Sequence, residues 1–149
     1  MAYSSRGLAY ADLGQYERAI EDCNEGIRLG PQDAMAYYIR GSAYFMLGQF
    51  ERAIEDCDEA IRLDPQNVGA HVNRGTAYDN LGQPERAIKD YDEAIRLDSQ
   101  DAMAYANRAI GYTLTGKDVE AQQDVERAIG LGLDRKILES KINSLKQEP

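Results

Sequence analysis

The sequence AMAYYIRGSAYFMLGQFERAIEDCDEAIRLDPQN, residues 34–67, decides the fold because the chain repeats it on both sides. Its second half, GQFERAIEDCDEAIRLDPQ from residue 48, returns as GQYERAIEDCNEGIRLGPQ at residue 14 and as GQPERAIKDYDEAIRLDSQ at residue 82. The spacing is 34 residues in both directions. A fixed period of this length indicates stacked units, none of which is large enough to bury a core alone.

Each unit predicts two helices joined by a short turn. In the quoted unit, residues 34–47 form the first predicted helix, with Tyr37, Gly41 and Tyr44 on one face. Residues 50–63 form the second, which ends before an Asp-Pro pair, and proline is common just beyond a helix. Tyrosine opposite alanine or glycine allows the two helices to approach closely.

The period divides the chain into four repeats and a tail. The predicted boundaries are 1–33 for a first repeat that is clipped at its N-terminus, 34–67, 68–101 and 102–133 for the next three, and 134–149 for a capping helix and tail. Asp134 is the predicted N-cap of that last helix. Its apolar stripe, expected to cover the fourth repeat, consists of Ile137, Leu138, Ile142 and Leu145.

The repeated pattern resembles the tetratricopeptide repeat family. The quoted unit matches it with Tyr37, Gly41, Tyr44, Ala53, Cys57, Ala60 and Pro65. The resemblance implies an all-α fold: a right-handed α-solenoid of four helix-turn-helix repeats plus the C-terminal capping helix. The chain departs from the family pattern where Leu or Ile is usual, because it has Arg6, Arg40, Arg74 and Arg108 there.

Those four arginines are matched by four aspartates with the same period: Asp22, Asp56, Asp90 and Asp124. An arginine on a packed helix face needs a partner if it is partly buried. We therefore predict that each arginine bonds to one of these aspartates, in its own or a neighbouring repeat. The alternative is that the arginines bind a ligand.

Composition argues against several classes of function. The net charge is −9, whereas nucleic acid and anionic membranes attract basic surfaces, so neither is an expected partner. No apolar run is long enough to predict a membrane span, and no signal-peptide pattern is visible. Cys23 and Cys57 occupy equivalent places in successive units, too far apart for a disulfide. We interpret both as buried apolar residues in a reducing compartment, which predicts a cytoplasmic protein.

No residues with the spacing of a catalytic or metal site are present. His71 is the only histidine and stands where other units have tyrosine, so we interpret it as a packing residue. One histidine and two separated cysteines do not form a metal cluster, and no phosphate-binding loop is visible. The sequence predicts a protein that is not an enzyme and that uses no cofactor.

The predicted function is binding of a protein or peptide segment in the concave groove formed by the first helices. Residues about half a turn from the packed face would line this groove, and several are apolar. The candidates are Met35, Tyr38, Ile39, Ser42, Phe45, Met46, Val72, Asn73, Thr76, Asp79, Asn80, Met103, Asn107 and Ile110.

In this family, successive asparagines such as Asn73 and Asn107 can bind the backbone of an extended peptide. The family's clamp for C-terminal carboxylates also needs basic residues, and the corresponding places in the first three repeats and in repeats two to four have none. Binding of acidic chaperone tails by that clamp is therefore not expected. The alternative function is a structural module that self-associates through its exposed terminal repeats or stacks within a longer repeat protein.

Overall fold

The computed structural model describes residues 2–148, and these residues form nine helices and no strand. All-α architecture is therefore confirmed. The helices are α1 (Ala2–Asp12), α2 (Tyr16–Leu29), α3 (Ala34–Met46), α4 (Phe50–Leu63), α5 (Val68–Asn80), α6 (Pro84–Leu97), α7 (Ala102–Leu114), α8 (Asp118–Gly130) and α9 (Arg135–Lys146).

Local sequence signals set the ends of these helices. The side chains of Asp33, Asn67 and Asp101 accept hydrogen bonds from backbone N–H groups in the first turns of α3, α5 and α7. Pro84 begins α6, where a missing N–H is tolerated. The turn inside each pair contains a glycine with φ between +73° and +76°, a conformation that other residues rarely adopt. These glycines are Gly14, Gly48, Gly82 and Gly116.

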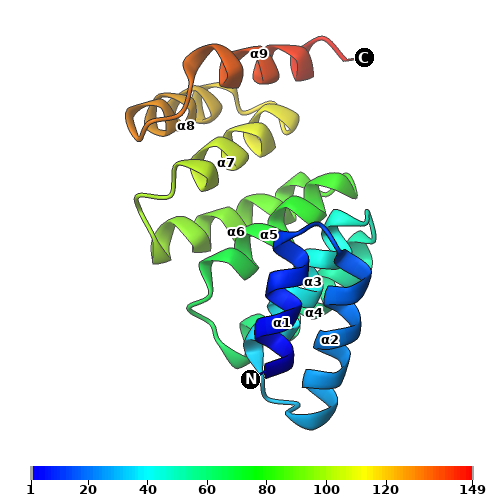
Figure 1. Ribbon diagram of the computed structural model, residues 1–149. Coiled ribbons are helices and arrows are strands. Elements are labelled where there is room, and N and C mark those ends of the chain that lie inside the picture. Colours follow the sequence, from blue (N-terminus) through cyan, green and yellow to red (C-terminus); the bar gives the residue numbers. More distant parts are fainter. Residues whose placement is uncertain (1, 149) are drawn as a thin grey trace.

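The four helix pairs stack in sequence order, with α1 at one end of the array and α9 at the other (Figure 1). Each odd-numbered helix contacts the next odd-numbered helix, from α1 to α9. The even-numbered helices α2, α4, α6 and α8 make no such contacts with one another among the described residues. The stack is therefore a solenoid that curves toward its odd-numbered helices, and we call the surface they form the inner groove.

Small residues allow the two helices of each pair to pack closely. Ala53, Ala60 and their equivalents in the third repeat are fully buried. In that repeat the ring of Tyr91 lies against Gly75, where a Cβ atom would come within 2.7 Å of the ring. Tyr91 itself is fully buried, so this large-into-small contact is part of the core.

The predicted pairing of the periodic arginines and aspartates is confirmed, and all four pairs lie within one repeat. Each arginine donates two hydrogen bonds, from Nε and Nη2, to the two carboxylate oxygens of the aspartate 16 residues later. The distances between donor and acceptor atoms are 2.6–3.0 Å. Two parallel bonds to one carboxylate fix the geometry of the arginine.

Three of these arginines also bond to the preceding repeat. The Nη1 atoms of Arg40, Arg74 and Arg108 donate to Asn24, Asp58 and Asp92, each at 2.8 Å. Each of these arginines therefore links two second helices to the first helix between them. We call this continuous series of bonds the arginine ladder.

Helix α9 covers the last repeat, as its predicted role requires. Its N-cap is Asp134, and Leu138 and Ile142 are buried in a cluster with Tyr105 and Val125. The expected position of Ile137 in the covering stripe is wrong, because its side chain is 72% exposed. Ile137 precedes Leu138 by one residue and consequently points about 100° away from it around the helix.

Candidate functional site in the inner groove

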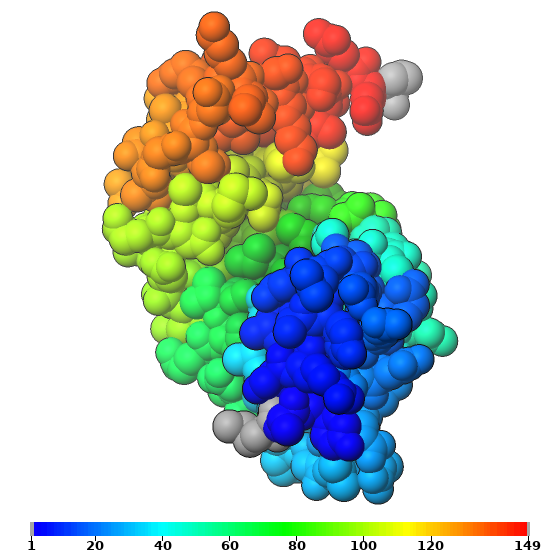
Figure 2. Space-filling view, viewed as in Figure 1, coloured from blue at the N-terminus to red at the C-terminus, as the bar shows by residue number. Residues whose placement is uncertain are grey.

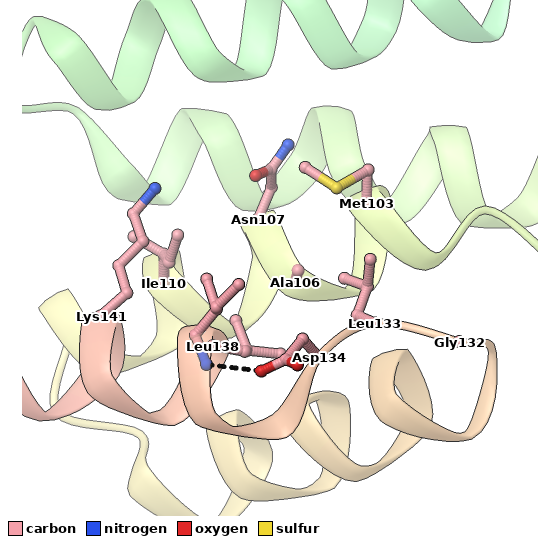
Figure 3. Close-up of a pocket in the computed structure, with 10 residues that line it drawn as sticks. Met103, Ala106, Asn107, Ile110, Gly132, Leu133, Asp134, Leu138 and Lys141 are labelled. Atoms are coloured by element: carbon pink, nitrogen blue, oxygen red, sulfur yellow. Dashed lines mark hydrogen bonds between the residues drawn. The ribbon is translucent and has the colours of Figure 1, made fainter.

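The inner groove contains two apolar pockets, one at each end of the array. The pocket at the C-terminal end lies between α7 and α9 and has a volume of about 360 Å³. We call it the C-terminal pocket. Figure 3 shows that its side chains come from α7, from α9 and from the segment between α8 and α9. They are Met103, Ala106, Asn107, Ile110, Gly132, Leu133, Asp134, Ile137, Leu138 and Lys141.

Two polar side chains stand beside this apolar floor. The carboxamide of Asn107 and the ammonium group of Lys141 point in the same general direction in Figure 3, away from the pocket floor. Among the described residues, Asn107 makes no hydrogen bond to another side chain and Lys141 makes no ion pair. Asn107 therefore has both a donor and an acceptor available, and Lys141 has a free positive charge.

The pocket at the N-terminal end lies between α1 and α3 and has a volume of about 300 Å³. Tyr38, Ile39, Ser42 and Met46 line its α3 side, and Leu8 and Asp12 are among the residues that line its α1 side. The rim of this pocket includes a carboxylate, whereas the C-terminal pocket has Lys141. The two ends of the groove therefore differ in charge.

The predicted groove residues differ widely in exposure. Met35, Met46 and Met103 are 49–57% exposed, and Asn80 is also exposed. Ile39 is only 2% exposed, so the expectation that it faces outward is wrong. The neighbouring helix α1 covers α3 on this side, and Ile39 forms part of the pocket floor.

Two aromatic candidates are partly occupied by contacts inside the protein. Tyr38 packs against the backbone of Gly69, where a Cβ atom would come within 2.6 Å of its hydroxyl oxygen. Phe45 lies edge-on to Phe50, with ring centroids 5.4 Å apart. Both side chains are half-buried, which makes them poorer test positions than the exposed methionines.

Polar residues in the middle of the groove bond to neighbouring helices. Asn73 donates from Nδ2 to the hydroxyl oxygen of Ser42 at 2.7 Å, which joins α5 to α3. Val72, Thr76 and Ile110 are half-buried. Asp79 accepts a hydrogen bond from the Tyr91 hydroxyl at 2.6 Å, so this carboxylate is held from below by the core.

The remaining Asp79 oxygen is buried and has no hydrogen-bond partner among the described residues. Burial raises the pKa of Asp79 to about 6, although the hydrogen bond from Tyr91 and the charge of Lys141 oppose this change. The folded state therefore binds a proton more tightly than the unfolded state. Stability contributed by this proton is present below the unfolded pKa and is lost as pH rises through about 6.

We expect Asp79→Asn to flatten the dependence of stability on pH between about pH 4.5 and about pH 7. The wild-type protein should lose about 1–2 kcal/mol more than the variant over this interval, after allowance for solvent screening. Urea unfolding at both pH values measures the difference. Equal losses in the two proteins would show that Asp79 does not titrate in this range.

The sequence analysis did not include the residues that α9 and its preceding segment contribute to the groove. Leu133, Ile137 and Lys141 line the C-terminal pocket, yet we expected only a cover for the last repeat. A signal was present, because Ile137 and Lys141 follow Met103 and Asn107 by 34 residues. The period therefore continues into α9.

Outside the groove, the histidine and cysteines have structural environments. His71 is 6% exposed, and its Nε2 lies 3.1 Å from the carbonyl oxygen of Pro65. Burial raises the pKa of the Cys23 and Cys57 thiols to about 12, which leaves both unreactive at neutral pH. Within residues 2–148, no group of three metal-binding side chains comes together, and no helix is long and apolar enough to cross a bilayer.

Solved structures with the same architecture include protein-binding domains. A crystal structure of MamA is 29% identical with a TM-score of 0.82, and the match covers 93% of this chain and 79% of MamA. The second TPR domain of human RPAP3, solved with the HSP70 peptide SGPTIEEVD, is 31% identical with a TM-score of 0.70. That match covers 73% of this chain and 91% of the domain.

The first TPR of Spaghetti (RPAP3), bound to the HSP90 peptide SRMEEVD, is 27% identical with a TM-score of 0.68. It covers 84% of this chain and 91% of its own. No match was found among curated protein sequences. Family models described as tetratricopeptide repeat match residues 4–68 and 68–101, which together are more than half of the chain. The chain therefore belongs to the tetratricopeptide repeat family.

Proposed function

We propose that this protein is an interaction scaffold that binds a peptide or protein segment in its inner groove. The C-terminal pocket carries this proposal, because it combines an apolar floor with hydrogen-bonding groups that no other part of the protein uses. Binding sites for organic ligands usually have this composition. The two RPAP3 domains, which were solved with bound peptides, support a peptide as the ligand.

An apolar side chain of the partner, seated in the C-terminal pocket, would supply most of the affinity. Burying one such side chain contributes about 1.5–3 kcal/mol. Asn107 would bond to the partner's backbone, and Lys141 would contact a carboxylate or carbonyl oxygen. One lysine in a chain with a net charge of −9 does not favour a strongly acidic partner, so the apolar anchor is the more important part.

Selection from a random displayed peptide library on the immobilised full chain tests this proposal. Peptides enriched on the wild-type protein should share one apolar residue at a fixed place. Their binding should compete with one another, since they would occupy the same pocket. A set of peptides without a common apolar residue would contradict the proposed anchor.

Ile137→Ser is expected to weaken binding of the selected peptides about 10- to 100-fold, because it removes apolar surface that the anchor would cover. Ile137 is 72% exposed in the free protein, so its replacement should not disturb folding. Val119→Ser is the matched control, since Val119 is 70% exposed on α8, away from the groove. Isothermal calorimetry measures both affinities, and equal affinities would exclude the C-terminal pocket as the binding site.

A further inference from the structure

The outer face of α1 has the composition of an interface between repeats. In α3, Ala36 and Ala43 lie four residues before and three residues after Arg40, so all three share one helical face. Arg40 bonds to Asn24 of α2, which shows that this face lies against the preceding repeat. The equivalent small residues of α5 and α7 are also buried, and they are Ala70, Ala77, Ala104 and Gly111.

In α1 the same positions are exposed. Ala2 and Ala9 are open to solvent, and Leu13 at the end of the helix is 71% exposed. Among the described residues, no helix lies against this face of α1. Figure 2 shows α1 in blue at the surface of one end of the molecule. The face therefore continues the series of interfaces between repeats, but without a neighbour.

The arginine ladder is also incomplete at this end. The side chain of Arg6 is 60% exposed, whereas those of Arg40, Arg74 and Arg108 are 19–23% exposed. Arg6 holds Asp22 with Nε and Nη2, as its equivalents hold their aspartates. Its Nη1 has no acceptor among the described residues, whereas each equivalent Nη1 bonds to a side chain on the preceding second helix. An acceptor on a second helix would complete the ladder.

At the other end of the molecule, the corresponding acceptor is present but occupied. Glu126 of α8 follows Asp92 by 34 residues, so it is the next acceptor of the series. Arg135 of α9 binds both of its carboxylate oxygens, with each bond 2.9 Å long. Helix α9 contacts α7 and α8, where the first helix of another repeat would lie.

We propose that the outer face of α1 binds the C-terminal end of a second copy of this chain, and that α9 restrains this assembly by occupying the same place. In the assembled form, Arg6 of one copy would take the position of Arg135 against Glu126 of the other. The two charges are complementary, and both faces carry the composition of the buried interfaces. Because the two faces differ and lie at opposite ends, the copies would join head to tail into open chains (Figure 1).

The test releases α9 in the full chain and measures the size of the particles by sedimentation velocity. Leu138→Glu combined with Ile142→Glu removes the buried contacts of α9. Arg135→Glu is a milder second variant that places like charges together at Glu126. Circular dichroism shows whether each variant keeps its helices. We expect the wild type to remain monomeric, and the released variants to form oligomers that grow with concentration.

A further substitution identifies the surface that joins the copies. Ala9→Glu, added to each released variant, places a bulky charge on the outer face of α1 and should restore monomers. Ser5→Glu is the control, because Ser5 is exposed on the same helix but is not at one of the interface positions. Released variants that stay monomeric would overturn the proposal. Oligomers that persist with Ala9→Glu would also overturn it, because the uncovered α7 surface would then be associating with itself.

Discussion

Replacing Tyr91 with alanine is expected to destabilise the protein by about 3–5 kcal/mol, the range for deleting a large buried aromatic side chain. The ring is fully buried and fills the space that Gly75 leaves between α5 and α6. The replacement also leaves the partly buried carboxylate of Asp79 without its hydrogen-bond donor. Urea unfolding followed by circular dichroism measures the change in the free energy of unfolding.

Tyr91→Phe separates the two contributions, because it keeps the ring and removes only the hydroxyl group. We expect this variant to lose about 1–3 kcal/mol, the cost of an unsatisfied buried acceptor. Cys57 and Phe45 occupy the places of Tyr91 and Asp79 in the second repeat. The combined variant Tyr91→Cys and Asp79→Phe should therefore be more stable than the sum of its single changes predicts. Simple additivity would show that the two residues are not coupled.

Asp90→Ala is expected to cost about 3–5 kcal/mol, because it removes two bonds from a mostly buried arginine. Arg74 would retain only Asp58, which lies on the neighbouring repeat. The equivalent change Asp22→Ala should cost less than about 1 kcal/mol, since water can solvate the exposed Arg6. Thermal and urea unfolding of the two variants compare the same bonds in different solvent environments.

The comparison is matched because both aspartates receive two bonds from an arginine 16 residues earlier. Both are also at least 90% buried as side chains. Only the exposure of the arginine and its link to the preceding repeat differ. Similar losses in the two variants would mean that burial of the arginine does not determine the strength of the ladder.

The fold was predictable because periodic residues carry redundant information. Four copies of one pattern fixed the helix pairs, and the shared period of arginine and aspartate predicted their pairing. The third bond of each arginine was not predicted, because its acceptors are Asn24, Asp58 and Asp92, which differ in chemical type. Their equivalence becomes clear only when the distance between adjacent second helices is known.

The groove was less predictable because the exposure of a residue depends on helices distant in the sequence. The position of Ile39 half a turn from the packed face predicted exposure, but α1 covers it. The reverse holds for Ile137, which an amphipathic pattern assigned to the covered side of α9. A single helix shows which residues share a face, whereas the stacking of helices decides which face remains open.

The unequal ends of the arginine ladder give the array a direction of local unfolding. Repeat proteins open from their ends, and each end opens according to the contacts it makes with its neighbour. Helix α1 has a neighbour on one side only and an arginine in water, whereas α8 is tied to α9 through Glu126. Backbone amides should therefore exchange with solvent first in α1 and α2. The C-terminal pocket then lies in the part of the array that stays folded while the other end opens and closes.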